Sequence, residues 1–204
     1  ISDTSRPGWN NPSPNAGFYS TYQPSILIIP RRPTNLFYNL STPAEWVSEY
    51  NCFYGPTGIC AGGQFRYWDH DLTYAEILDK ESDMLLQYLL KWDIDPLMFH
   101  QANVRAYDGA NSLLGDLLKE TLRKYSQVYN VPVQFITQHD IGLRMAQRMS
   151  YNNARVTATL IPCQSITLRA VGAARIPVTG IVYGPAGNRE VYGGQTTSFV
   201  SLSA

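Results

Sequence analysis

The sequence predicts an α/β domain followed by a small all-β module. Up to about residue 150, short β-branched apolar runs alternate with segments whose apolar residues recur at helical spacing, and beyond Tyr151 the helical period disappears. Alternating strands and helices are typical of a parallel sheet or barrel covered by helices. We therefore predict an α/β domain over residues 1–150 and an antiparallel β module over residues 151–204.

Composition narrows the class of protein and its partners. The chain has 204 residues, 44% of them hydrophobic, which is enough for one globular domain with a core and a small appendage. Its 16 basic residues equal its 16 acidic residues, so no net field draws it to nucleic acid or to an anionic membrane. No apolar run approaches the roughly 18 to 20 residues of a membrane span. We predict neither a nucleic-acid partner nor a membrane span.

The first half of the chain carries one strand signal and two helix starts. Residues 25–29 form a short apolar run that ends at Pro30, as a buried strand does. The run Thr-Pro-Ala-Glu at residues 42–45 is a capping box with proline in the first turn, and predicts a short helix to about Tyr50. A second capping box at residues 73–76 predicts a helix that ends near Trp92.

The second half continues the alternation and then changes texture. We predict a strand over residues 97–100, a helix from Asn111 to about Tyr129, a strand over 132–137 and a helix over 140–150. Four β-branched runs separated by Gly, Pro and Asn follow, at residues 155–162, 165–172, 176–184 and 196–203.

The three cysteines bear on the cellular compartment. Cys52 and Cys60 flank a Gly/Pro loop, a spacing that fits a loop-closing disulfide, with free thiols as the alternative. Metal ligation would need further ligands, and none stand nearby. Asn39 begins a glycosylation sequon, which matters only in a secreted protein. Cys163 either pairs outside this sequence or is buried and free. The chain begins without methionine or a leader, so we expect it to come from the middle of a longer protein.

Two of the three histidines are candidates for catalysis. His100 ends one predicted strand and His139 follows the next, and the carboxyl ends of parallel strands form the active-site face of α/β proteins. The alternative is a core histidine bonded to a backbone carbonyl. His70 precedes a capping box, where helix entry is the simpler interpretation. The sequence has no HxxxH, HxH or CxxC spacing and so displays no complete metal site, and it has no GxSxG, P-loop or GxGxxG.

Several runs of residues together resemble one enzyme family. SDTSRP, IIPRRPTNLFYN, DPLMFHQANVR and FITQHDIGLRMAQRM resemble, in order and spacing, the later part of the catalytic domain of fungal secreted galactosaminogalactan deacetylases. The similarity covers about residues 1–150, and the β tail resembles the C-terminal module of that family more loosely. It implies a (β/α) barrel of polysaccharide-deacetylase type, a polysaccharide substrate and an extracellular location in the cell wall or matrix.

The resemblance also implies roles for individual residues. Members use a divalent metal, usually taken as zinc, held by an aspartate and two histidines, with a further aspartate as general base. His100 is similar to the late histidine that protonates the departing amine, and Asp3 to the carboxylate that orients it. Gln101, Asn103 and Arg105 are then expected to hold the loop or to touch sugar hydroxyls. Arg31, at the carboxyl end of the first predicted strand, is expected to bind substrate or to pair with a carboxylate, and His139 is expected to bind substrate. The metal site would lie upstream of Ile1, so this segment alone is expected to be inactive and to require the upstream part of the same protein.

Aromatic residues near the expected site loops suit stacking on sugar rings or ordinary packing. They are Tyr38, Trp46, Tyr54, Tyr67 and Trp68. The leading hypothesis is part of a secreted, metal-dependent N-deacetylase that acts on an N-acetylhexosamine polymer. The alternatives are a non-catalytic carbohydrate-binding or cell-wall protein on the same fold, and a different hydrolase built on His100 and His139.

Overall fold

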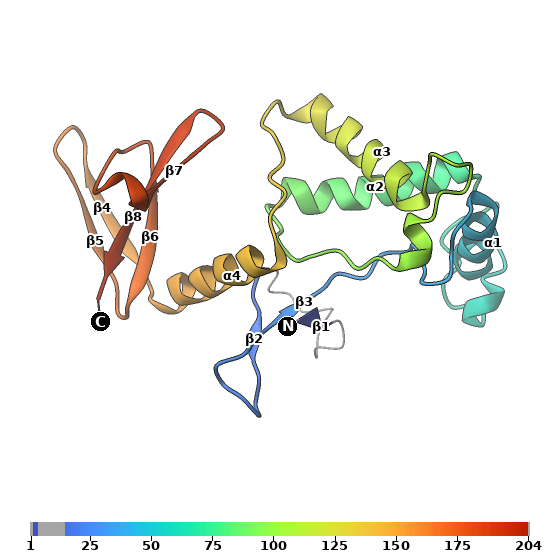
Figure 1. The fold of residues 1–204 in the computed structure, drawn as a ribbon, viewed down its shortest axis with the longest axis horizontal. Coiled ribbons are helices and arrows are strands. Elements are labelled where there is room, and N and C mark those ends of the chain that lie inside the picture. The colour runs from blue at the N-terminus through green and yellow to red at the C-terminus, as the bar shows by residue number, and fades with distance from the viewer. Residues whose placement is uncertain (1, 4–14, 204) are drawn as a thin grey trace. The chain divides into compact units, whose positions relative to one another are not determined.

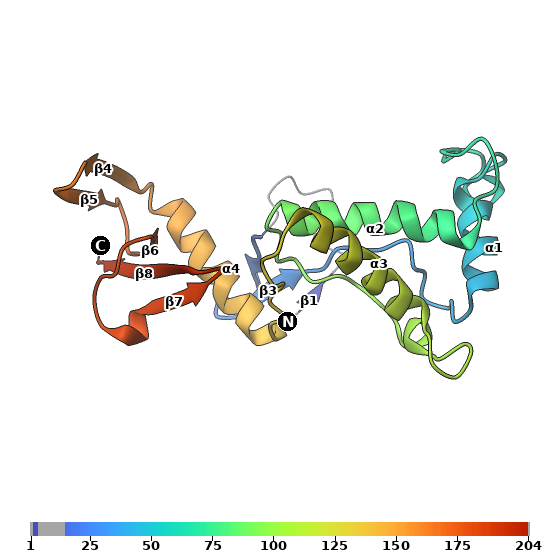
Figure 2. The same ribbon diagram turned by 90° about the horizontal axis from the view of Figure 1, so that it is seen from above.

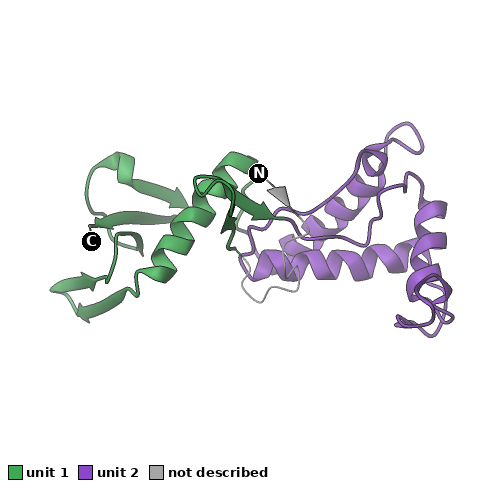
Figure 3. Ribbon diagram, turned by 90° about the horizontal axis from the view of Figure 1, so that it is seen from below, with its two compact units in different colours: residues 1–30, 131–204 green, residues 31–130 purple. Residues whose placement is uncertain are grey.

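The computed structural model describes residues 2–3 and 15–203, which combine helices with several small sheets (Figure 1). The chain divides into two compact units, coloured separately in Figure 3. We call residues 31–130 the helical unit, and residues 1–30 with 131–204 the strand unit. The predicted domain boundary at residue 150 separates the α/β part from the β tail, whereas the two units are defined by contacts between residues. The predicted division into domains therefore stays a prediction.

All four predicted helices are present. They are α1 (Pro43–Tyr54), α2 (Tyr74–Leu90), α3 (Leu113–Val128) and α4 (Gln138–Asn153). Thr42 and Thr73 form the expected capping boxes with Glu45 and Glu76, which satisfy backbone N–H groups at the first turns of α1 and α2. No helix in the described part of the chain is long and apolar enough to cross a membrane.

The helical unit has its own core. In Figures 1 and 2, α2 and α3 lie side by side, and α1 packs at one end of α2. Lys124 of α3 joins the two long helices, because its ammonium group donates to the Asp79 carbonyl at 2.7 Å and to the Asp83 carboxylate at 2.6 Å. The core consists of buried apolar residues from all three helices and the loops before them: Leu36, Leu40, Trp46, Tyr50, Leu72, Ile77, Leu85, Leu113 and Leu117.

A buried carboxylate lies inside this core. Glu81 is only 5% exposed, and its Oε1 accepts hydrogen bonds from the Tyr50 hydroxyl at 2.8 Å and from Asn35 Nδ2 at 3.0 Å. Burial raises the pKa of Glu81 despite these two donors, because a charged carboxylate loses more hydration than two hydrogen bonds replace.

The predicted strand at residues 25–29 is confirmed as β3 (Leu27–Pro30). It pairs in parallel with β1 (Ser2–Asp3) and antiparallel with β2 (Phe18–Tyr19). Within the helical unit, Arg32 and Leu97 form a single parallel bridge. The described residues contain no closed barrel, so what is observed is a mixed α/β fold with short parallel pairings.

Two predicted strands are wrong. Residues 97–100 form no strand beyond the bridge at Leu97, and residues 132–137 are irregular. Leu97 and Phe99 instead pack against the core of the helical unit, so the apolar run serves side-chain packing rather than a ladder.

The antiparallel character of the tail is confirmed. A hairpin joins β4 (Thr157–Ile161) to β5 (Ser165–Arg169), and a three-stranded sheet has the order β6 (Ala174–Thr179), β8 (Gln195–Leu202) and β7 (Arg189–Tyr192). The sequence had not predicted β7.

The Cys52–Cys60 disulfide is confirmed and ties α1 to a 3₁₀ turn, η1 (Ile59–Ala61). Cys163 is unbonded within the described residues and is exposed, so it is not the buried thiol that the sequence left open.

Candidate functional site

His100 stands at the start of a short 3₁₀ helix, η2 (Gln101–Val104). Its backbone is extended, with φ −121° and ψ 162°. The His100 backbone N–H donates to Asn103 Oδ1 at 2.9 Å, and the His100 carbonyl accepts from the Asn103 backbone N–H at 3.0 Å. These two bonds fix the backbone of His100, which is a half-buried residue.

Asn103 connects His100 to a distant loop. Its side chain is fully buried at 0% exposure, and Nδ2 donates to the Phe37 carbonyl at 2.9 Å and the Leu40 carbonyl at 3.0 Å. The Asn103 amide therefore uses its acceptor on one loop and both donors on another. Two roles were expected for Asn103, holding the loop and contacting sugar hydroxyls. This arrangement supports the first of them.

The loop that Asn103 holds carries Tyr38. Leu36 and Leu40 are buried at 1% and 2% exposure, while Tyr38 between them is 71% exposed. The Tyr38 ring centroid lies 6.1 Å from that of His100, with the planes at 73° in an edge contact. The His100 imidazole thus lies beside the exposed Tyr38 ring. The loop that carries this ring is held by the hydrogen bonds of Asn103 to the Phe37 and Leu40 carbonyls.

The other polar residues predicted near His100 differ in exposure. Gln101, the first residue of η2, and Arg105, which follows its last residue, are both exposed. Arg31 is half-buried, and its Nε is buried without a hydrogen-bond partner among the described residues. Its neighbour Arg32 is structural: Nε donates to Asp93 at 2.6 Å, and the guanidinium lies 4.6 Å from the centre of the Tyr88 ring.

Asp3 and His139 belong to the strand unit. The backbone of Asp3 lies in β1 opposite Pro30, and its side chain is outside the described residues. His139 is exposed in the first turn of α4. Each therefore remains a prediction as a partner of His100.

His70 behaves as a helix-entry residue. Its ring nitrogens lie 2.7 Å from Asp69 Oδ1 and 3.4 Å from Glu76 Oε1, and all three groups are largely exposed. The bond to Asp69, with the one to Glu76, raises the pKa of His70. Glu76 in turn has its pKa lowered to about 2, chiefly by the Thr73 hydroxyl and backbone N–H of the capping box.

The candidate aromatic platforms separate into core and surface. Trp46 is 0% exposed and donates its indole N–H to the Asn35 carbonyl at 2.8 Å, so it packs the core. Tyr54 stacks on Tyr67 with centroids 5.6 Å apart, and Tyr67 is 65% exposed. Trp68 is half-buried. Tyr38 is thus the candidate in contact with His100.

The described residues do not fit a metal ion. No group of three or more His, Cys, Asp or Glu side chains in that part of the chain is arranged to hold one. This includes the surroundings of His100, and we derive no step of a reaction through a metal.

The arrangement is that of a carbohydrate-deacetylase fold. The chain superposes on a solved structure described as "Crystal structure of Agd3 a novel carbohydrate deacetylase", with a TM-score of 0.68 and 20% sequence identity over 93% of this chain. The family model of the Agd3 deacetylase domain matches residues 2–159. The chain belongs to the Agd3 deacetylase domain family. It spans 30% of the length of the solved Agd3 chain, and a comparison with curated proteins gave no match.

Proposed function

We propose that this chain is part of a secreted, metal-dependent polysaccharide N-deacetylase in which His100 is the general acid. The substrate is an N-acetylhexosamine polymer of the galactosaminogalactan type. Membership of the deacetylase family and the likeness to the Agd3 fold support the reaction class. The observation that carries the proposal is His100 itself, which is fixed by buried Asn103 beside exposed Tyr38.

The chemistry requires an acid at this point. Hydrolysis breaks the amide C–N bond, and the amine leaves only when its nitrogen receives a proton. Imidazole titrates near neutral pH and so supplies that proton under ordinary conditions. Proton transfer of this kind accelerates a reaction by roughly 10²- to 10⁴-fold. The Tyr38 ring would stack on a sugar beside the scissile amide.

The rest of the assembly follows from the same proposal. Asp3 orients His100, while Arg31, Gln101, Arg105 and His139 contact sugar hydroxyls. The metal, taken as zinc, is bound by residues outside this segment, in a barrel completed by the upstream part of the protein. The Cys52–Cys60 disulfide suits an oxidising compartment, and a glycan at Asn39 would agree with it. The parallel pairings of β1 with β3 and of Arg32 with Leu97 suit barrel strands.

The test is acetate release by the complete protein and by its His100→Ala and His70→Ala variants. Loss of the acid lowers kcat by about 10²-fold or more with little change in KM, and removes the pH limb that depends on the protonated imidazole. His70→Ala is the matched control, because it removes an exposed histidine at a helix entry. Unchanged kcat in His100→Ala would refute the acid role. A complete protein that binds polymer yet releases no acetate would be a carbohydrate-binding protein instead.

A further inference from the structure

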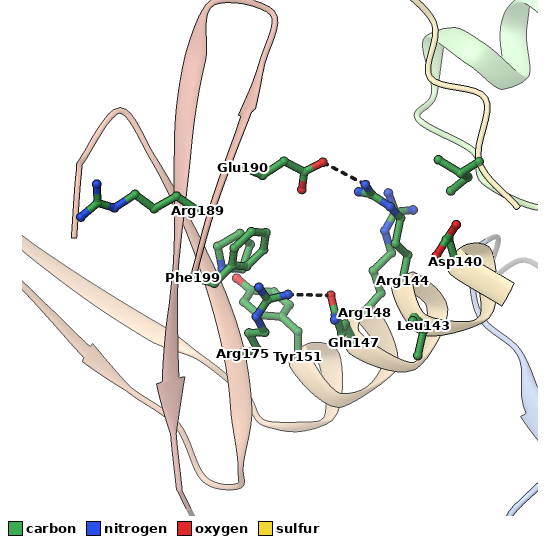
Figure 4. A pocket seen from close by; sticks show the side chains of 12 residues that line it. Asp140, Leu143, Arg144, Gln147, Arg148, Tyr151, Arg175, Arg189, Glu190 and Phe199 are labelled. Carbon is green, nitrogen blue, oxygen red and sulfur yellow. Dashed lines mark hydrogen bonds and ion pairs between the residues drawn. The ribbon is translucent and has the colours of Figure 1, made fainter. Parts of the chain in front are cut away.

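A concave site lies within the strand unit, and none of the residues proposed for catalysis lines it. It is a cavity of about 660 Å³ between α4 and the β6-β8-β7 sheet (Figure 4). This volume lies within the roughly 300 to 1,000 Å³ that is usual for small-molecule sites. Arg144, Gln147 and Arg148 reach into it from α4, and Arg175, Glu190 and Phe199 face them from the sheet.

The sheet presents a polar face to this cavity because side chains alternate along its strands. On β6, Ala174 and Ile176 are buried at 6% and 3% exposure in the apolar core of the module. Arg175 and Pro177 point the other way and line the cavity. Phe199 pairs with Pro177 across the ladder and joins the same face. The core of the module is therefore on one side of the sheet and the cavity on the other.

Helix α4 also turns a polar stripe toward the cavity. The lining positions on the helix recur at three- and four-residue spacing: Asp140, Leu143, Arg144, Gln147, Arg148 and Tyr151. Met145, on another side of the helix, is 0% exposed. A helix usually packs an apolar stripe on a sheet. Here charged and polar side chains of the helix and of the sheet face each other, and hydrogen bonds join Arg144 to Glu190 and Arg175 to Gln147.

Arg175 is the distinctive residue of the cavity. Its guanidinium lies 3.7 Å from the centre of the Phe199 ring, and its Nη1 donates to Gln147 Oε1 at 3.3 Å. Among the described residues no carboxylate lies within ion-pair distance of Arg175. Arg144, in contrast, is paired with Glu190 at 2.9 Å. A planar guanidinium placed over an aromatic ring, with N–H donors left over, suits a carboxylate on a ligand.

We propose that this cavity binds a carboxylate-bearing sugar, a uronate, with Arg175 receiving the carboxylate. The guanidinium fork binds the two oxygens of the carboxylate, and Arg144, Gln147 and Glu190 supply donors and acceptors for ring hydroxyls. Tyr151, exposed at 37%, offers an aromatic surface for the sugar ring. The cavity is far larger than a free acetate ion needs. This site lies outside the proposed catalytic function and does not depend on it.

Calorimetric titration of the full chain with galacturonate, methyl galactoside and sodium acetate tests the assignment. We expect galacturonate to bind at least about tenfold more tightly than either of the others, since each lacks one half of the recognised group. Arg175→Gln should weaken galacturonate binding by about tenfold or more. Arg175→Lys should bind galacturonate more tightly than Arg175→Gln and less tightly than the wild type. Arg169→Gln is the matched control, because Arg169 is an exposed arginine on β5 outside the cavity.

Four outcomes would overturn the proposal. Equal affinity for methyl galactoside and galacturonate would remove the role of the carboxylate. Equal affinity for acetate would remove the role of the sugar. Failure of the chain to bind galacturonate, or identical binding by the Arg175→Gln and Arg169→Gln variants with unchanged thermal unfolding, would remove the site itself.

Discussion

Replacing Asn103 by alanine should destabilise the helical unit markedly. The Asn103 side chain is fully buried and makes three hydrogen bonds, with the His100 N–H and with the carbonyls of Phe37 and Leu40. A neutral hydrogen bond contributes about 0.5 to 1.5 kcal/mol, and a buried group left without its partner costs about 1 to 3 kcal/mol. We therefore expect Asn103→Ala to lower the free energy of unfolding by about 3 kcal/mol.

The assay is urea unfolding followed by tryptophan fluorescence. Three of the four tryptophans, Trp46, Trp68 and Trp92, belong to the helical unit, so most of the signal reports on the part of the chain that contains Asn103. The control is Gln101→Ala two residues earlier, where an exposed side chain is removed and the change should stay within about 0.5 kcal/mol. A loss below about 1 kcal/mol in Asn103→Ala, with an unchanged denaturant slope, would refute the reasoning.

Asn103→Asp separates hydrogen bonding from side-chain volume. The variant keeps an acceptor for the His100 N–H but loses both donors and places a carboxylate in a buried position. At neutral pH it should be at least as destabilised as the alanine variant, and it should recover in part as the pH falls and the carboxylate becomes protonated. Equal stability of the aspartate variant and the wild type at pH 7 would contradict the proposed donor role.

Two further predictions concern the same unit. Glu81→Gln keeps an oxygen for Tyr50 and Asn35 and removes a buried carboxylate, so it should raise stability at neutral pH. Because burial raises the pKa of Glu81, the native wild-type protein binds more protons than the unfolded chain. The stability that Glu81 contributes is therefore present below its unfolded pKa and is lost as the pH rises through its folded pKa. The urea midpoints of wild type and variant should accordingly converge toward pH 4. Replacing Cys52 and Cys60 with serine opens a loop with a sequence separation of 8 and should cost about 2.5 kcal/mol by chain entropy, and an unchanged urea midpoint would contradict it.

Helices were predictable because their signals are local. Thr42 and Thr73 each stand three residues before a glutamate, and both form the capping boxes that the sequence indicates. The disulfide was predictable for the same reason, since Cys52 and Cys60 enclose a short loop. In these cases the residues that decide the structure are neighbours in the chain.

Strands failed where the partner was remote. An apolar run such as residues 97–100 becomes a strand only if another segment offers a ladder, and here Leu97 finds one bridge to Arg32 across 65 positions of the chain. The run was predicted to be a strand, but Leu97 and Phe99 pack their side chains against the core of the helical unit instead. Short runs of this kind do not distinguish a strand from an extended packed segment.

The surroundings of His100 were only partly predictable. The histidine itself was a candidate, yet nothing in the sequence indicates that Tyr38 contacts it or that Asn103 reaches the loop of Leu40. The cavity on the strand unit was missed altogether. The alternation of β6, with Ala, Ile and Val on one face and Arg, Pro and Thr on the other, was the one available signal, because it predicts a strand with two unlike faces.

The two-faced sheet separates folding from recognition along a single strand. Substitutions at Ala174 or Ile176 disturb the core of the module, whereas substitutions at Arg175 change only what the cavity offers to a ligand. The ligand preference of this sheet can thus be changed at every second position of β6 without touching the residues that form the core of the module. A library that randomises Arg175, Glu190 and Phe199 should therefore yield many folded proteins with altered specificity. A library that randomises Ala174 and Ile176, the buried positions of β6, should yield few.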